Sequence, residues 1–208
     1  EPIPINPLIC NLKYLNRYAV KGPWFLDKNI IKKYRFSIII PSFNESKYLP
    51  YLFKSLNKQT KVLLNKTLVV IVINNLKDSN NSIIKNNQAT LDYLNQIKVQ
   101  FDFVFINAFS GYLALDNKYG GVGFARKIGA DLILKYLYDN AIICFTDADV
   151  ILSKNYLEFI NEKIINKRNA CVLGFKHQKT TNSKINNAIF KYEKILYKTA
   201  QLIKKTGS

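Results

Sequence analysis

Apolar positions along the chain follow two patterns, short continuous runs and a three-to-four-residue repeat. The runs are rich in β-forming Ile, Val and Phe, and they predict strands at Arg35–Pro41, Thr67–Asn74, Phe101–Ile106, Ala141–Thr146 and Ala170–Phe175. The repeat predicts helices at Ser46–Asn57, Ser82–Gln96, Gly121–Tyr138, Leu152–Lys167 and Asn186–Lys205. Strands that alternate with helices, with one strand apolar on both faces, predict an α/β fold with a mostly parallel central sheet.

The first 34 residues have a different composition from the rest. Four of the six prolines and the only tryptophan, Trp24, lie there. We therefore expect an irregular N-terminal arm over residues 1–34, with one short helix near Asn11–Val20. The α/β domain then covers residues 35–208.

The formal net charge is +17, from 31 Lys and Arg against 14 Asp and Glu, and all but four of the basic residues are lysines. A compositional bias that covers the surface with lysine explains this most simply. Attraction to an anionic lipid surface is the functional alternative. Scarce arginine, and the lack of a recognition-helix or zinc-finger pattern, predict that nucleic acid is not a partner.

Two further features bear on location. No apolar run approaches the roughly 18 residues of a membrane span, and the N-terminus lacks the layout of a signal peptide. The three cysteines are widely spaced and odd in number, which disfavours a disulfide framework and fits a reducing compartment. We expect a cytoplasmic protein, with peripheral association at the inner face of the membrane as a further option.

In parallel sheets, ligands bind at the carboxyl ends of the strands, so the residues after each strand are the candidates for function. The first strand leads into Pro41, Phe43, Asn44 and Glu45, which offer a ring for stacking on a base and polar groups for contacts. Asn74 and Asn75 end the second strand. Their two amides can read a nucleobase edge, but they are equally ordinary turn residues.

Glycines precede the helix predicted from Gly121. They permit close backbone approach, the helix N-terminus favours an anion, and Arg126 in its first turns can hold a phosphate. A dinucleotide-binding fingerprint is disfavoured, because position 126 is Arg and a long loop separates the glycines from the preceding strand.

The fourth strand is followed by Asp147-Ala148-Asp149. Two carboxylates at i and i+2 form an oxygen-rich pair that suits Mg²⁺ or Mn²⁺ with substrate phosphates completing the coordination shell. A turn or helix cap is the simpler interpretation of so short a motif. His177 is interpreted either as a further metal or phosphate contact or as a loop histidine. Asp131, about one helical turn after Arg126, is interpreted either as a residue that orients Arg126 or as a solvent-exposed or helix-side aspartate.

Taken in order, three stretches resemble glycosyltransferase family 2, the inverting enzymes of the GT-A fold. They are Ser37–Glu45, Gly121–Gly129 and Thr146–Val150, and the resemblance covers residues 35 to 175. It implies a Rossmann-like GT-A three-layer sandwich that binds a nucleotide-diphosphate sugar, with a UDP-sugar favoured. It also implies divalent-metal-dependent, inverting transfer of the sugar to a saccharide, lipid-linked or small-molecule acceptor.

The same resemblance implies roles for single residues. Phe43 and Glu45 would lie near the base, and Arg126 near the sugar and phosphate. Asp147 would lie near the ribose or sugar and Asp149 on the metal, with both aspartates as the metal-binding pair. The nucleotide-sugar site would therefore comprise Pro41, Phe43, Asn44, Glu45, Asn74, Asn75, Arg126, Asp147, Ala148 and Asp149.

Two departures from the family pattern matter. Many members have Asp where Asn74 and Asn75 stand, which leaves the base identity open. The acids after Asp149 are Glu158, Glu162 and Glu193, all in helical patterns, with no acidic pair among them. We therefore expect a fragment that ends before the acceptor-binding part, with the general base beyond Ser208. A non-catalytic nucleotide-sugar-binding module and a nucleotidyltransferase are the alternative functions.

Overall fold

The computed structural model describes residues 13–163 and 170–206. They belong to two compact units, residues 1–165 and residues 166–208, and each unit is described by itself. None of the described helices is long and apolar enough to cross a membrane.

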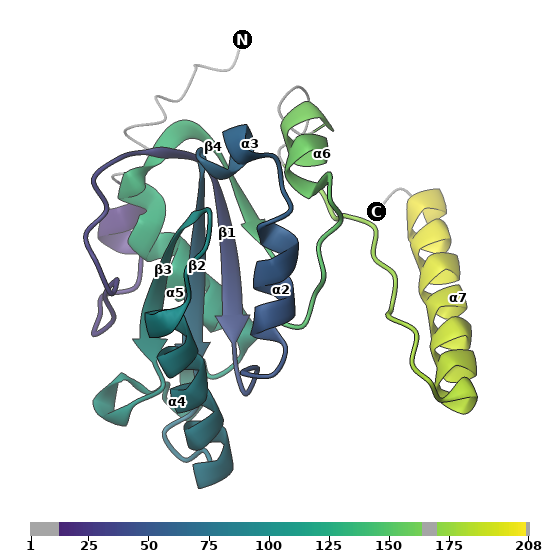
Figure 1. Cartoon of the computed structure of the whole chain (residues 1–208), viewed down its shortest axis with the longest axis horizontal. Coiled ribbons are helices and arrows are strands. Elements are labelled where there is room, and N and C mark those ends of the chain that lie inside the picture. The colour runs from purple at the N-terminus through teal and green to yellow at the C-terminus, as the bar shows by residue number, and fades with distance from the viewer. Residues whose placement is uncertain (1–12, 164–169, 207–208) are drawn as a thin grey trace. The chain divides into compact units, whose positions relative to one another are not determined.

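The first unit is built on a four-stranded parallel sheet (Figure 1). The strands are β1 (Tyr34–Ser42), β2 (Thr67–Asn74), β3 (Asp102–Ala108) and β4 (Leu137–Phe145), in the spatial order β3-β2-β1-β4. β1 and β2 are buried almost throughout, as their continuous apolar runs predict. The predicted α/β class with a parallel sheet is thus confirmed.

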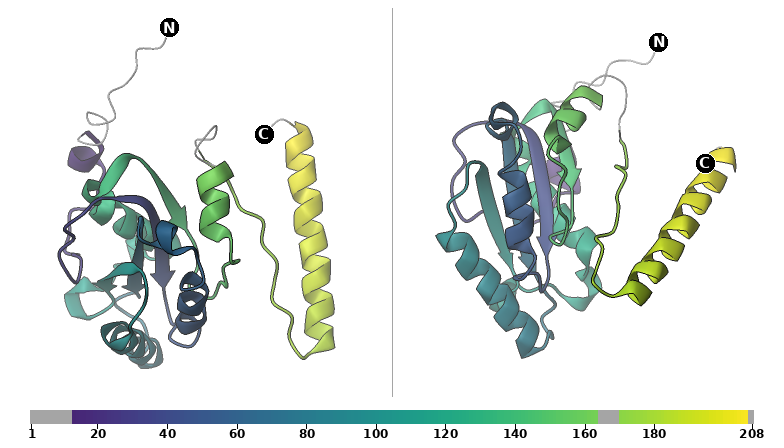
Figure 2. Two further views of the ribbon diagram at one scale, coloured as in Figure 1. Left: turned by 45° about the horizontal axis from the view of Figure 1, so that its top comes forward. Right: turned by 45° about the vertical axis from the view of Figure 1, so that its right-hand side comes forward.

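Helices cover both faces of this sheet, so the unit has three layers (Figures 1 and 2). The helices of the first unit are α2 (Leu49–Leu56), α3 (Lys61–Leu64), α4 (Asn81–Gln96), α5 (Val122–Ile133) and α6 (Tyr156–Lys163). Phe53 of α2 packs on Phe103 of β3 and Tyr93 of α4, on one face. α5 covers the other face, where Gly129 lies against Ile39 and Val72.

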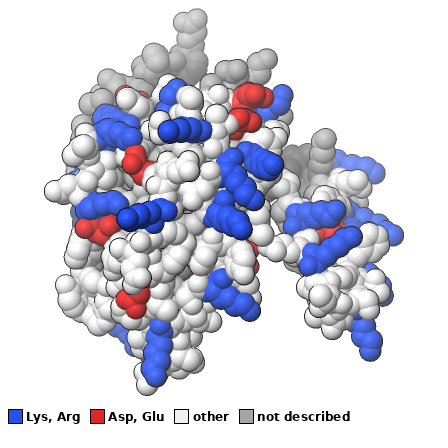
Figure 3. Space-filling model, in the orientation of Figure 1, with Lys and Arg blue, Asp and Glu red and all other residues white. Residues whose placement is uncertain are grey.

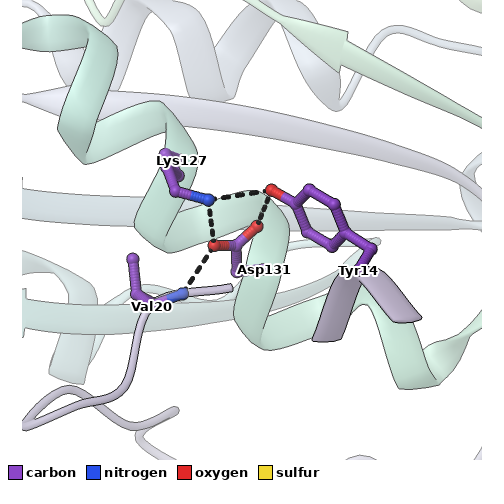
Figure 4. Close-up of polar contacts among 4 residues, drawn as sticks. All are labelled: Tyr14, Val20, Lys127 and Asp131. Carbon is purple, nitrogen blue, oxygen red and sulfur yellow. Dashed lines mark hydrogen bonds and ion pairs between the residues drawn. The ribbon is translucent and has the colours of Figure 1, made fainter. Parts of the chain in front are cut away.

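The N-terminal segment is tied to α5 by a buried carboxylate (Figure 4). Asp131 accepts hydrogen bonds from the Tyr14 hydroxyl, the Val20 N–H and the Lys127 ammonium group, each at 2.8 Å. The Asp131 side chain is only 2% exposed. Burial alone lowers the pKa of Lys127, but its hydrogen bonds to Asp131 and Tyr14 raise that pKa on balance.

Two predictions about elements are wrong. The helix predicted to run to Tyr138 ends at Ile133, and after a short 3₁₀ turn at Leu134–Tyr136 the chain enters β4 at Leu137, which pairs with Tyr34. The three residues after Leu137 are exposed and two of them are polar, so the start of this strand gives no apolar run to detect. The stretch predicted as a strand at Ala170–Phe175 has no regular secondary structure and no sheet partner among the described residues, and Val172 is 97% exposed.

The remaining boundaries shift by a few residues. The predicted Ser46–Asn57 helix begins only at Leu49, and the predicted Leu152–Lys167 helix begins at Tyr156. Positions 164–167 of the latter lie outside the described residues. In the second unit, α7 (Ser183–Thr206) begins three residues before the predicted start at Asn186. The short helix expected near Asn11–Val20 covers residues 13–17, and positions 11 and 12 lie outside the described residues.

Candidate functional site

A cavity of about 530 Å³ opens at the carboxyl ends of β1, β2 and β4. In the sheet order, β1 lies between β2 and β4, so this is the point where the connections change direction and where ligands bind in such folds. Eight of the ten predicted site residues line it: Pro41, Phe43, Glu45, Asn74, Asn75, Asp147, Ala148 and Asp149.

The two other predicted site residues lie beside the cavity. Arg126, from the second turn of α5, donates from Nη2 to Asp147 Oδ1 at 2.6 Å and so reaches one of the lining carboxylates. Asn44 has a φ of 62°, and its N–H donates to the side chain of Asn87 at 3.0 Å. It therefore shapes the loop that holds Phe43 and Glu45 rather than forming part of the lining itself.

The two aspartates lie in a turn that continues from β4. The Thr146 N–H donates to the Ile39 carbonyl at 3.2 Å, which extends the pairing with β1 by one residue. The Val150 N–H donates to the Asp147 carbonyl at 3.4 Å. Downstream, the Leu152 N–H donates to Ser55 Oγ and Gln59 Nε2 donates to the Ser153 carbonyl, both from the α2 side. The aspartate turn is thus fixed to the framework on both sides.

Negative charge concentrates at this end of the cavity. Burial, followed by the nearby charges of Asp149 and Asp147, raises the pKa of the Glu45 carboxyl. Glu45 Oε2 is buried and has no hydrogen-bond partner within the described chain. Three carboxylates that repel one another in this way leave room for a cation or for donors from a ligand.

The chemistry of the donors fits a hard divalent cation held only in part by protein. Asp147 and Asp149 supply oxygens, the ligands that Mg²⁺ and Mn²⁺ prefer. Within residues 13–163 and 170–206, no group of three or more His, Cys, Asp or Glu is arranged to hold a metal by itself. A cation here would therefore need oxygens from a bound phosphate.

Two structural features of the cavity wall at the start of α5 favour binding of an anion. Gly121 lines the cavity with φ at 114°, a left-handed conformation that favours glycine, and it directly precedes α5. The N–H groups at the start of that helix carry partial positive charge. Val122, Leu76 and Leu115 add apolar surface to the wall.

The loop between β3 and α5 supplies part of that wall. The Leu115 N–H donates to the Asn75 carbonyl, and the Lys77 N–H donates to the Leu115 carbonyl, both at 2.9 Å. An ion pair between Lys77 and Asp116 adds a further contact between the same two loops. No sequence pattern indicates this pairing, because Leu76 is a single apolar residue between Asn75 and Lys77, and the apolar stretch that ends at Leu115 has no strand or helix periodicity.

Other candidates lie elsewhere. Asp131 binds Lys127, Tyr14 and Val20, so it does not orient Arg126. In the second unit, His177 Nδ1 lies 2.9 Å from Glu193 Oε1, and the His177 N–H donates to the same oxygen at 2.9 Å. Glu193 has a lowered pKa through these bonds. His177 is thus a partner of α7.

Asn87 is the functional candidate that sequence reasoning missed. It is fully buried, on α4, and its amide contacts both segments that carry the predicted base-binding residues. A signal is present in the sequence. Asn87 falls three residues after Ile84 and four before Leu91, so a polar side chain occupies the apolar face of a helix.

Comparison with known proteins gives little beyond the fold. No protein-family model matches the chain, and no curated protein matches it. Among solved structures, S. aureus TarS 1–349 in complex with UDP-GlcNAc is similar at 24% identity and a TM-score of 0.38, over 62% of this chain and 31% of that chain. S. aureus TarS 1–349 alone is similar at 24% identity and a TM-score of 0.37, over 66% and 38%. The chain thus spans about a third of the length of the structures it matches. So low a likeness assigns no activity.

Proposed function

We propose that this chain binds a nucleotide-diphosphate sugar, with a UDP-sugar favoured, as the donor-binding part of a metal-dependent, inverting glycosyltransferase. One observation carries the proposal. Residues predicted to contact a base and a metal come from three separate strand ends and line a single cavity, and Arg126, predicted to contact the diphosphate, pairs with Asp147 beside it. Its volume, about 530 Å³, lies within the range of small-molecule sites, about 300–1,000 Å³.

Each wall of the cavity suits one part of such a donor. The exposed ring of Phe43 and the amide of Asn74 suit the base, by stacking and by hydrogen bonding. The N-terminus of α5 and Arg126 suit the diphosphate. A divalent cation held by Asp147 and Asp149 would neutralise charge on the diphosphate leaving group.

The acceptor half of the reaction is not assigned to the described residues. Glu158 contacts Thr60 and Glu193 contacts His177, and neither glutamate lines the cavity. Donor binding is therefore the activity that this chain itself should show. A module that binds the donor without transferring the sugar shares the same cavity, and sugar transfer or donor hydrolysis by the chain would separate the two functions.

The decisive experiment is thermal unfolding with UDP, ADP or GDP, each with and without MnCl₂. UDP with Mn²⁺ should raise the Tm most, because the proposed site favours this pair and a ligand that binds only the folded state stabilises that state. Asp149→Ala should abolish this gain. Asp139→Ala, an exposed change on β4 outside the cavity, is the matched control and should retain it. An unchanged Tm with every nucleotide, with and without metal, would contradict the proposal.

We also propose a peripheral contact with anionic membranes through α7. Lys191, Lys194 and Lys198 recur along one side of this helix, while Glu193 is its only acid. The opposite side carries large apolar residues, and Ile185, Tyr192 and Ile203 are each about half exposed. A helix with a lysine-rich face and an apolar face is typical of binding at the surface of a bilayer. Over the visible face of the first unit, by contrast, basic side chains are scattered among acidic ones (Figure 3).

A further inference from the structure

The buried carboxamide of Asn87 joins two strand ends of the cavity. Its Nδ2 donates to the Asn74 carbonyl at 3.1 Å and to Asn75 Oδ1 at 2.8 Å. Its Oδ1 accepts from the Asn44 N–H at 3.0 Å. One side chain on α4 therefore binds the loop after β1 and the end of β2 at once.

The orientation of this amide follows from its neighbours. A backbone N–H can only donate and a backbone carbonyl can only accept, so Asn44 fixes the oxygen of Asn87 and Asn74 fixes its nitrogen. The Asn87 nitrogen must then donate to Asn75 Oδ1. The Asn75 nitrogen in turn donates to the carbonyls of Leu76 and Phe109, at 2.8 and 3.2 Å.

These bonds give Asn74 and Asn75 different roles. Both donor hydrogens of the Asn75 amide are used inside the protein, so Asn75 acts as a link in the framework. Asn74 lines the cavity and is only 4% exposed, yet its Oδ1 has no hydrogen-bond partner within the described chain. A buried polar atom in that state is available to a ligand, because leaving it unpaired is costly.

Asn87 also acts on the loop after β1. Asn44 holds a left-handed backbone conformation, φ 62°, between Phe43 and Glu45, which both line the cavity. Asparagine tolerates this conformation better than most residues, and the bond from its N–H to Asn87 holds it in place. Loss of that bond would let Phe43 and Glu45 move relative to Asn74.

We propose that Asn87 is a positioning residue for the nucleoside end of the cavity. Through its bonds to both strand ends, it holds Phe43 and Asn74 at the spacing that a base requires. The proposal rests on the proposed function, since it assumes that the cavity binds a nucleotide. Asn87 itself does not line the cavity and need not touch the ligand.

The test compares UDP with inorganic pyrophosphate, both in the presence of Mn²⁺, by isothermal titration of the full chain. Asn87→Ala removes the hydrogen bonds to both strand ends and should weaken UDP binding about tenfold or more, as expected for loss of more than one hydrogen bond. Pyrophosphate binding should change less than about twofold, because the diphosphate end stays intact. Asn87→Asp keeps the side-chain volume and the contact to Asn44, but it places a carboxylate oxygen against the Asn74 carbonyl and Asn75 Oδ1. It should therefore show the same selective loss of UDP binding.

The matched control is Asn86→Ala. Asn86 precedes Asn87 on α4, and its Oδ1 accepts from the Ser46 N–H at 3.0 Å, so it holds the same loop without a link to Asn74 or Asn75. This variant should bind UDP within about twofold of wild type. Hydrogen exchange at the Asn44 amide gives a ligand-free measure, with protection lost in Asn87→Ala and kept in Asn86→Ala.

The outcomes separate the two proposals. Equal losses for UDP and pyrophosphate, or no loss for either, would overturn the role of Asn87 while leaving the proposed function intact. A wild-type chain that binds neither ligand would overturn the proposed function. In that case Asn44 amide exchange still decides whether Asn87 holds the loop.

Discussion

Arg126 on α5 and Asp147 after β4 form an ion pair, with Nη2 and Oδ1 2.6 Å apart. Both side chains are partly exposed, at 33% and 56%, so the pair is open to a ligand. It joins the helix whose N-terminus favours a phosphate to the turn that carries the candidate metal-binding carboxylates. An incoming diphosphate would offer Arg126 a second anionic partner in the same place.

The first prediction concerns Arg126. Arg126→Ala should weaken UDP binding about 10- to 100-fold, the effect of losing one charge-assisted hydrogen bond. The free energy of unfolding should change by less than about 1 kcal/mol, because exposed ion pairs contribute little. Arg126→Lys should lie in between, and Arg35→Ala, at the start of β1 and away from the cavity, should bind normally. Titration calorimetry and urea unfolding measure the two effects. Normal UDP affinity in Arg126→Ala would remove this residue from the site.

The second prediction concerns Glu45, whose carboxyl has a raised pKa because of burial and the charges of Asp149 and Asp147. The folded state then binds a proton more readily than the unfolded state, so the ionised carboxylate destabilises the chain at neutral pH. Glu45→Gln should raise the free energy of unfolding at pH 7. The gain should shrink as pH falls through the raised pKa and disappear only below 4.5, the ordinary value, where the wild-type carboxyl is protonated in both the folded and the unfolded state.

Urea unfolding from pH 4.5 to 8, without metal or nucleotide, measures this difference. Glu162→Gln, an exposed change on α6, serves as the control and should show no comparable pH-dependent gain. If Glu45→Gln were less stable than wild type at pH 7, the electrostatic account of this end of the cavity would be wrong.

The strands and the residues that follow them could be predicted because buried strands of a parallel sheet are continuous apolar runs, and their carboxyl ends share one edge. That rule alone brings Pro41, Asn74 and Asp149 to one place, and all three line the cavity. The rule fails where strand pairing, and not apolar composition, decides whether a segment becomes a strand. Leu137 joins the sheet because it pairs with Tyr34 of β1, whereas the apolar stretch Ala170–Phe175 has no strand beside it among the described residues.

Side-chain partnerships were harder to predict than elements. Asp131 lies one turn after Arg126 and Lys127 on the same helix, and nothing in its spacing shows that residues 14 and 20 would reach it. Asn87 shows the opposite case. Its position on an apolar face is visible in the sequence, but its partners depend on how closely α4 packs against the ends of β1 and β2.

The third prediction concerns the fit of α5 on the sheet. A Cβ at Gly129 would lie 2.6 Å from Ile39 Cγ2 and 3.0 Å from Val72 Cγ2, both on stiff β-branched side chains. Gly129→Ala should therefore lower the free energy of unfolding by about 1–3 kcal/mol. Gly123 in the same helix has no atom within 4 Å of an added Cβ, so Gly123→Ala should instead stabilise by about 0.5 kcal/mol. Urea unfolding of both variants compares the two sites, and equal effects would contradict the close packing.

The fourth prediction concerns α7. The chain should sediment with vesicles that contain an anionic lipid and not with neutral ones, and salt should weaken this binding. Ile185→Glu with Ile203→Glu places charge on the apolar side and should reduce binding about tenfold or more, since each buried side chain of this size contributes more than about 1 kcal/mol. The control pair Asn187→Glu with Gln201→Glu adds the same charge on the lysine side, which separates charge from loss of apolar contact. Equal losses for both pairs would indicate attraction by charge alone.

The last prediction concerns the buried carboxylate of Asp131. Asp131→Asn keeps the shape but removes the charge from three hydrogen bonds, to Tyr14, Val20 and Lys127, and leaves the Lys127 ammonium group with less compensation. The free energy of unfolding should fall by about 2 kcal/mol, as is usual for lost charge-assisted hydrogen bonds. Because two of the partners belong to the N-terminal segment, the variant should also be cleaved faster within residues 13–33 by a protease at low concentration. Asp92→Asn, an exposed change on α4, should alter neither property. If Asp131→Asn lost stability without faster cleavage in that segment, the carboxylate would stabilise α5 alone and would not hold the N-terminal segment on it.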